Sequence, residues 1–304
     1  MRYSLTSRVR GTLIGALFGQ SLATTEITED SYWSKVATQG MESLIARGVF
    51  DLEEWNKFYP EGCNSEESCN LILANAILAT LPVALFFHDN HIKLRQNLLL
   101  AIEKHNCSLL KDGVLAVGYL VAQSLNEKIH PTSLVAEITA FIGKTTSELP
   151  IKLQLVNNLI VENVGYSELQ NCLGKENNIS NIIAVAFYCF ATTREDFRLT
   201  CLRAYKNKYS SQACGAIAGA ISGAYNGMAG IPITWHLGLD EAKLAQWGLT
   251  SFSQMVELAD ALVAVWSGVY NVLPQFKQIK EAKNTNLSFS QNEAIAAPYI
   301  IRLR

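Results

Sequence analysis

The sequence predicts an all-α protein, on three observations. Apolar residues recur at steps of three and four, as in Leu258, Leu262, Val265 and Val269, which is the spacing of one face of a helix. Residues that cap helices precede several of these segments. Runs of alternating β-branched residues joined by hairpin turns are scarce, so we expect no sheet.

Capping signals and prolines support individual elements in chain order. We expect capping boxes, in which a side chain at the start of a helix binds a backbone N–H three residues later, at Asp51 with Glu54, Asn64 with Glu67, Thr192 with Glu195 and Ser251 with Gln254. Pro131 fits the first turn of a helix that runs to about Ile142. The predicted helices are 7–22, 33–47, 52–58, 65–81, 91–105, 112–127, 132–143, 151–161, 166–173, 179–191, 194–206, 211–228, 238–246 and 252–280.

Connections between the predicted helices are short, and no linker rich in proline, glycine or serine divides the chain. We therefore expect one domain over residues 1–304. Its last segment, 284–304, has less regular periodicity and is predicted to be a tail over the surface of the bundle.

Glycine recurs at every fourth position in two of the predicted helices. Gly11, Gly15 and Gly19 form one series, and the other has the same spacing over Gly215, Gly219, Gly223 and Gly227. Each glycine costs a helix interior about 1 kcal/mol relative to alanine. A stripe without side chains offsets this cost where another backbone approaches closely. We therefore expect these two helices at the centre of the bundle, packed against each other.

Composition excludes several classes of protein. Charged residues make up 17% of the chain, below the roughly 25% that is usual, and the net charge is −2. No lysine and arginine block indicates nucleic-acid binding. The longest apolar runs, 76–87 and 182–191, are much shorter than the ~20 residues that cross a bilayer. Seven cysteines at irregular spacing indicate reduced thiols, so we expect a cytoplasmic protein without a membrane partner.

Several segments together resemble one known family. The opening SRVRGTLIGALFGQSLA, the stretch EDFRLTCLRAYKNKYSSQACGAIAGAISGAYNGMAGIPITW (195–235), MESLIARGVFD (41–51) and ANAILATLPVALFF (74–87) are similar to blocks of ADP-ribosylglycohydrolases. The resemblance implies a single compact orthogonal multi-helix bundle. It also implies a site with two Mg²⁺ ions, which hydrolyses the glycosidic bond between ADP-ribose and a modified group.

The acids that would bind magnesium in this family are mostly replaced here. The acid that ends the first glycine helix corresponds to Gln20, and the two acids before the second correspond to Ser210 and Gln212. The family's remaining acidic motif falls on Ser31 to Ser34 without gaps, or on Thr28, Glu29, Asp30 and Ser31 with a three-residue shift. Neutral amides and hydroxyls attract Mg²⁺ far less than carboxylates do.

The hypothesis that follows is a catalytically impaired relative, a pseudoenzyme with no metal ligands and no cofactor. Its candidate ligand-binding residues are Gln20, Thr28, Ser210, Ser211 and Gln212, and its expected partner is an ADP-ribose-like small molecule. One alternative is an active hydrolase with a rebuilt site around Glu29 and Asp30, the only candidate catalytic residues. Another is an interaction or assembly protein, for which a homo-oligomer would be expected from the low surface charge.

Overall fold

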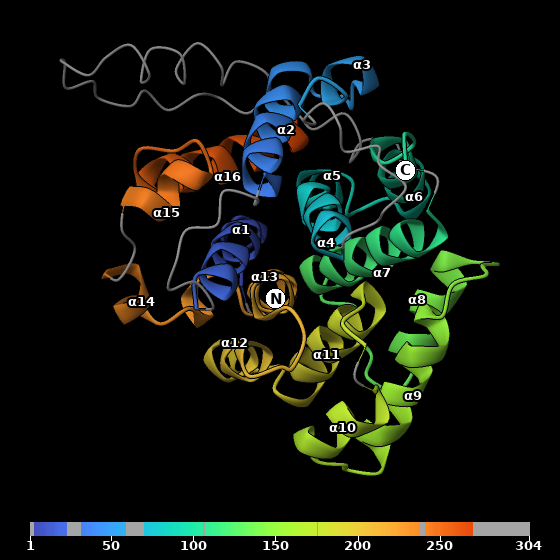
Figure 1. Cartoon of the computed structure of the whole chain (residues 1–304). Helices are drawn as coiled ribbons and strands as arrows, with labels where there is room; N and C mark the ends of the chain where they lie inside the picture. The colour runs from blue at the N-terminus through green and yellow to red at the C-terminus, as the bar shows by residue number, and fades with distance from the viewer. Residues whose placement is uncertain are drawn as a thin grey trace.

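Two antiparallel helices form the centre of the fold, α1 (Leu5–Ser21) and α13 (Ser211–Asn226). The computed structural model describes residues 3–22, 32–58, 70–105, 107–174, 176–237 and 241–269. Around the central pair lie helices of both halves of the chain, with α7, α11, α12 and α16 in direct contact with it (Figure 1). The elements other than the central pair are α2 (Trp33–Arg47), α3 (Leu52–Trp55), α4 (Asn70–Ala79), α5 (Leu81–Phe86), α6 (His91–Ala101), α7 (Ser108–Leu125), α8 (Leu134–Ile142), α9 (Leu149–Val161), α10 (Tyr166–Cys172), α11 (Ile179–Thr192), α12 (Phe197–Tyr205), the 3₁₀ turn η1 (Met228–Gly230), α14 (Ile233–Leu237), α15 (Glu241–Gln246) and α16 (Phe252–Trp266).

The described residues contain helices and no strand, which confirms the predicted fold class. Within the same ranges, no helix has the length and apolarity needed to cross a membrane. The core is continuous through the bundle and includes three fully buried tryptophans, Trp33, Trp55 and Trp247. Trp33 packs edge-on against Trp247 with 4.8 Å between ring centroids, so the first turn of α2 is fixed against the segment after α15.

The glycine stripes bring the backbones of α1 and α13 into direct contact along both helices. A methyl group added at Gly15 would lie 2.2 Å from the carbonyl oxygen of Gly219, and one at Gly19 would lie 1.9 Å from that of Gly215. At the other end of the pair, Gly11 meets Gly223 in the same way. The predicted pairing of the two glycine helices is therefore confirmed.

Several predicted helix boundaries were wrong. The helix expected over 65–81 corresponds, in its described part, to α4, which ends at Ala79. The next helix, α5, was not predicted; it is separate from α4 and starts after Thr80, because Pro82 lacks the N–H that a continuous helix needs. The helix expected over 252–280 ends at Trp266. There Gly268 adopts φ +100°, and Val269 N–H donates to the Ala264 carbonyl, which closes the helix end.

The remaining differences concern starts and caps. Helix α7 begins at Ser108, four residues before the prediction, and α14 was not predicted. Thr192 lies at the end of α11 and does not cap α12, whose N-cap is Asp196. The caps at Asp51 and Ser251 are confirmed, since their side chains accept from the backbone N–H of Glu54 and Gln254. The pair Asn64 and Glu67 lies outside the described residues.

His88 gives the fold a testable dependence on pH. The imidazole is buried and packs at a tilt against Trp266, with 4.9 Å between ring centroids, and its Nδ1 donates to the Leu85 carbonyl at 2.8 Å. Burial lowers the pKa of His88, and this effect exceeds the opposing hydrogen bond to Leu85. Between the lowered pKa and the ordinary value of about 6.5, the unfolded chain binds the extra proton and the folded protein does not. Stability therefore rises with pH through that window.

We expect the free energy of unfolding to fall as the pH drops below about 6.5, with a smaller fall in His88→Gln. Urea unfolding of both proteins between pH 8 and pH 5 measures the two slopes. At pH 8 His88 is neutral in both the folded and the unfolded state, so the difference in the free energy of unfolding between the two proteins there measures the packing loss alone. Identical slopes for the two proteins would show that His88 contributes nothing to acid sensitivity.

Candidate functional site

The candidate site lies where α1 ends and α13 begins. Gln20 is buried in the last turn of α1, directly after Gly19, and Gly19 touches the Gly215–Ala216 backbone in the first turns of α13. Ser210 is the N-cap of α13, and its Oγ accepts from the Ala213 N–H at 3.5 Å. The glycine contact therefore brings Gln20 to the end of the molecule where Ser210, Ser211 and Gln212 start α13.

The position and exposure of the predicted site residues on α13 follow from where they lie in the helix. Ser211 and Gln212 occupy the first turn of α13 and are partly exposed, whereas the next residues of the helix are buried. The first N–H groups of a helix lack intrahelical partners, and the helix dipole makes this end attractive to anions. Thr28, Glu29 and Asp30 lie outside the described residues, so the structure places only four of the seven predicted positions.

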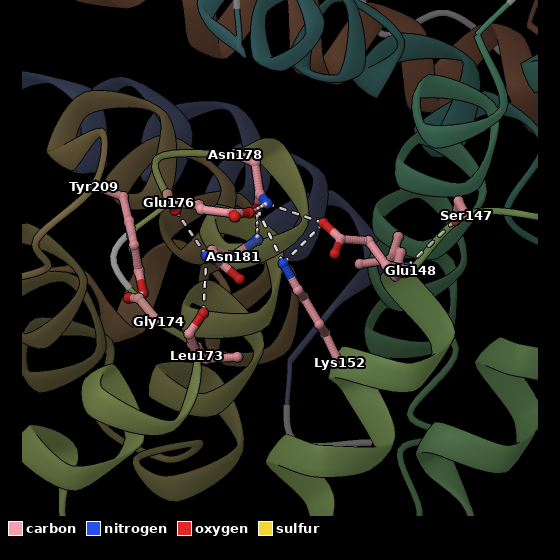
Figure 2. Close-up of polar contacts among 10 residues, drawn as sticks. Ser147, Glu148, Lys152, Leu173, Gly174, Glu176, Asn178, Asn181 and Tyr209 are labelled. Atoms are coloured by element: carbon pink, nitrogen blue, oxygen red, sulfur yellow. Dashed lines mark hydrogen bonds and ion pairs between the residues drawn. The ribbon is translucent and has the colours of Figure 1, made fainter.

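A polar network that the sequence did not predict lies beside this site (Figure 2). Its centre is Asn178, the N-cap of α11, whose Nδ2 donates to Glu148 Oε1 at 2.9 Å and to Glu176 Oε2 at 3.3 Å. Lys152 Nζ reaches Glu148 Oε1 at 2.8 Å and Asn178 Oδ1 at 3.3 Å. The hydrogen bond from Lys152 is the main reason why the pKa of Glu148 lies below its ordinary value.

The same network joins the starts of three helices. Tyr209, which precedes the N-cap of α13, donates its hydroxyl to the Gly174 carbonyl at 2.7 Å. Asn181 Nδ2 donates to the Leu173 and Glu176 carbonyls at 3.2 and 2.7 Å, which holds the loop before α11. Because Glu148 is the N-cap residue of α9, the beginnings of α9, α11 and α13 are linked through this loop.

Asp112 adds a fourth helix to this group. It is buried in α7 and accepts from the hydroxyls of Thr145, at 2.5 Å, and Ser147, which lie just before α9. Its carboxylate oxygen Oδ2 is shared by both hydroxyls. Motif reading missed Asp112, Glu148 and Asn178 because each is one polar residue in an ordinary loop or helix. Only the N-cap pattern of Asn178 was open to detection from the sequence.

The donor chemistry of the four placed positions does not by itself fit a pair of Mg²⁺ ions. Mg²⁺ binds through carboxylates and other hard oxygen ligands in octahedral geometry. The placed positions offer amides and hydroxyls, Gln20, Ser210 and Gln212, and the nearby Glu148 is already paired with Lys152. Across the described ranges, no three His, Cys, Asp or Glu side chains group in a way that could hold a metal.

Several aromatic, histidine and cysteine side chains of types that often form sites have structural roles here. Trp33 is part of the core and is closed to a ligand ring. His88 is buried against Trp266, while His91 Nε2 lies 3.2 Å from Gln123 Nε2 on the neighbouring α7, so the two histidines do not form one site. Cys189, Cys201 and Cys214 are buried, and burial raises the pKa of each thiol, which leaves them unreactive.

Comparison with known proteins places this chain in a family. Residues 43–271 match the family model of ADP-ribosylglycohydrolase. A solved chain described as an "ADP-ribosylglycohydrolase-related protein complex" has 18% sequence identity and a TM-score of 0.57. The alignment covers 86% of this chain and 99% of the other, so the two share a fold. No curated protein matches the sequence.

Proposed function

Because the chain belongs to the ADP-ribosylglycohydrolase family, we propose that it is a member that has lost hydrolysis and binds an ADP-ribose-like small molecule without magnesium. One observation supports this most directly. The glycines that pair α1 with α13 are kept in full contact, while the three positions at the junction carry the neutral side chains of Gln20, Ser210 and Gln212. Unselective divergence would have eroded the glycines as well.

Electrostatics favours a diphosphate at such a junction. In the first turn of the 16-residue helix α13, Ala213 N–H donates to Ser210 Oγ, and the first-turn N–H groups have no partner within the helix ladder. The positive end of the helix dipole lies at the same place. Without carboxylates at Gln20, Ser210 and Gln212, nothing at these positions repels the phosphates, and no cation is required to neutralise them. Loss of metal chemistry and retention of nucleotide-like binding are thus compatible.

Two measurements on the purified full chain test the proposal. We expect calorimetric titration to give the same ADP-ribose affinity with Mg²⁺ and with a chelator. We also expect no release of ADP-ribose from modified peptides, under conditions in which an active family member releases it. Magnesium-dependent release would instead support the active hydrolase built around Glu29 and Asp30. Absence of ADP-ribose binding would reject the binding half of the proposal.

A charge placed at the start of α13 should weaken this binding. We expect Gln212→Glu to lower ADP-ribose affinity about tenfold, because a carboxylate near the diphosphate costs roughly 1–2 kcal/mol at the edge of a protein. Titration in low salt measures the change, and Gln96→Glu, with the same charge change on the exposed side of α6, serves as the control. Equal affinities for the two variants would place the ligand away from α13.

A further inference from the structure

A cavity of about 350 Å³ lies at the end of α11 opposite Asn178, away from the candidate site. Its walls come from the end of α9 and the following turn, the start of α10, the end of α11 and α12. Since α11 has 14 residues, about 20 Å of helix separates its C-terminal end, which lines this cavity, from its N-cap Asn178. The volume falls at the lower end of the ~300–1,000 Å³ range of ligand pockets, which suits a compound much smaller than ADP-ribose.

Arg203 supplies the charge of this cavity. Its Nη1 donates to Thr192 Oγ1 at 3.1 Å, and within the described chain no carboxylate pairs with its guanidinium. A guanidinium carries five N–H donors in a fixed plane, so most of them remain available to a ligand. Planar carboxylates match this geometry with two parallel hydrogen bonds.

The remaining walls combine aromatic, apolar and polar groups. Tyr166 and Tyr188 stand side by side, with 6.1 Å between ring centroids. The Tyr188 hydroxyl donates to the Val164 carbonyl at 2.6 Å, whereas the buried Tyr166 hydroxyl lies near Gln170 and Cys189 without a well-formed hydrogen bond. Ile160, Val164 and Gly165 give the cavity an apolar side. One positive group is thus set beside aromatic rings and apolar side chains.

The ends of two helices at this cavity carry negative partial charge, which opposes the attraction of Arg203 for an anion. The C-terminal ends of α9 and α11 carry partial negative charge of about half a unit each. Local donors bind several of these carbonyls: Val164 N–H binds the Leu159 carbonyl, Thr193 N–H binds that of Cys189, and Thr192 Oγ1 binds that of Tyr188. Since these groups are already hydrogen-bonded, the full charge of Arg203 is the strongest free interaction that the cavity offers.

We propose that this cavity is a second binding site, which takes a small carboxylate with a flat apolar body. Arg203 would bind the carboxylate, and the ring or chain of the ligand would lie along Tyr188, Val164 and Ile160. The site is separate from the α1–α13 junction, so it stands whether or not ADP-ribose binds there.

Benzoate is the probe, and benzamide, which has nearly the same shape without the charge, is its comparison. We expect saturable benzoate binding to the full chain at about 1 mM or tighter by calorimetry or ligand-observed NMR, and at least tenfold weaker binding of benzamide. Equal affinity for the two compounds, or no saturable benzoate binding, would overturn the proposal.

Variants on α12 locate the binding. We expect Arg203→Gln to weaken benzoate affinity at least tenfold, and Arg203→Lys to weaken it less, because lysine keeps the charge but loses the planar fork. Arg198→Gln removes the same charge from an exposed position of the same helix and should leave affinity unchanged. Thermal unfolding checks that each variant is folded. If Arg203→Gln does not fold, the benzoate affinities of Arg203→Lys and Arg198→Gln are compared instead. Weaker binding by Arg203→Lys supports the site, and equal affinities would reject it.

Discussion

Replacing Gly219 with alanine is expected to destabilise the folded protein by about 3 kcal/mol or more. An alanine normally stabilises a helix by about 1 kcal/mol relative to glycine. Here its methyl group would lie 2.1 Å from the Gly15 carbonyl oxygen, and the obstacle is backbone, which no side-chain rotation can relieve. The two helices would have to separate, and overpacking of this kind costs 1–3 kcal/mol or more. Urea unfolding monitored by circular dichroism measures the loss.

Two other glycines provide graded controls for this prediction. At Gly113 an added methyl group would meet the ends of the Ile77 and Ile183 side chains, at 2.6 and 3.0 Å, so Gly113→Ala should be milder. At Gly165 nothing lies within 4 Å, so Gly165→Ala should change stability by less than about 1 kcal/mol. Similar losses for Gly219→Ala and Gly165→Ala would mean that the helix pair tolerates separation.

Restoring carboxylates at the helix junction is expected to create magnesium binding. The variant Gln20→Asp, Ser210→Asp, Gln212→Asp places three negative charges around the contact between the end of α1 and the start of α13. Without metal these charges repel one another, and the one at buried position 20 is also desolvated, so the variant should be less stable than the natural protein. Mg²⁺ at millimolar concentration should recover several degrees of Tm, since it binds only the folded state.

A variant with the same side-chain shapes and no charge isolates the electrostatic contribution. Gln20→Asn, Ser210→Asn, Gln212→Asn should show no rise in Tm with Mg²⁺, and neither should the natural protein. Asp at position 210 is compatible with the fold because aspartate is as good an N-cap as serine. If the acidic variant also fails to respond to Mg²⁺, the three positions do not surround a common cation site.

The central helix pair was predictable because its signal is local and unusual. Glycine every fourth residue is costly in a helix unless a partner backbone removes the need for side chains, and the only other segment with the same spacing supplied that partner. The resemblance also located Gln20, Ser210 and Gln212 at one end of the bundle. That the segments are helices and not strands followed from the spacing of their apolar residues, because this spacing shows which face of each segment is buried.

The exact helix ends and the polar network around Asn178 were not predictable in the same way. The stop after Trp266 depends on Gly268 in a left-handed conformation, and the apolar pattern itself continues to Val269. Asp196 and Thr192 are both good caps by residue type, and only the packing of α11 selects Asp196. The link between Glu148 and Asn178 spans 30 residues and arises from tertiary structure alone.

The contact between α1 and α13 also constrains how the chain is made. The Met228 N–H donates to Ser7 Oγ across 221 positions of sequence, so the first helix leaves the ribosome long before its partner is synthesised. At a translation rate of 5–20 residues per second, this wait lasts on the order of ten seconds or more. During that time the glycine face of α1 lacks its native partner, α13. The central helix pair therefore forms only after most of the chain has been synthesised.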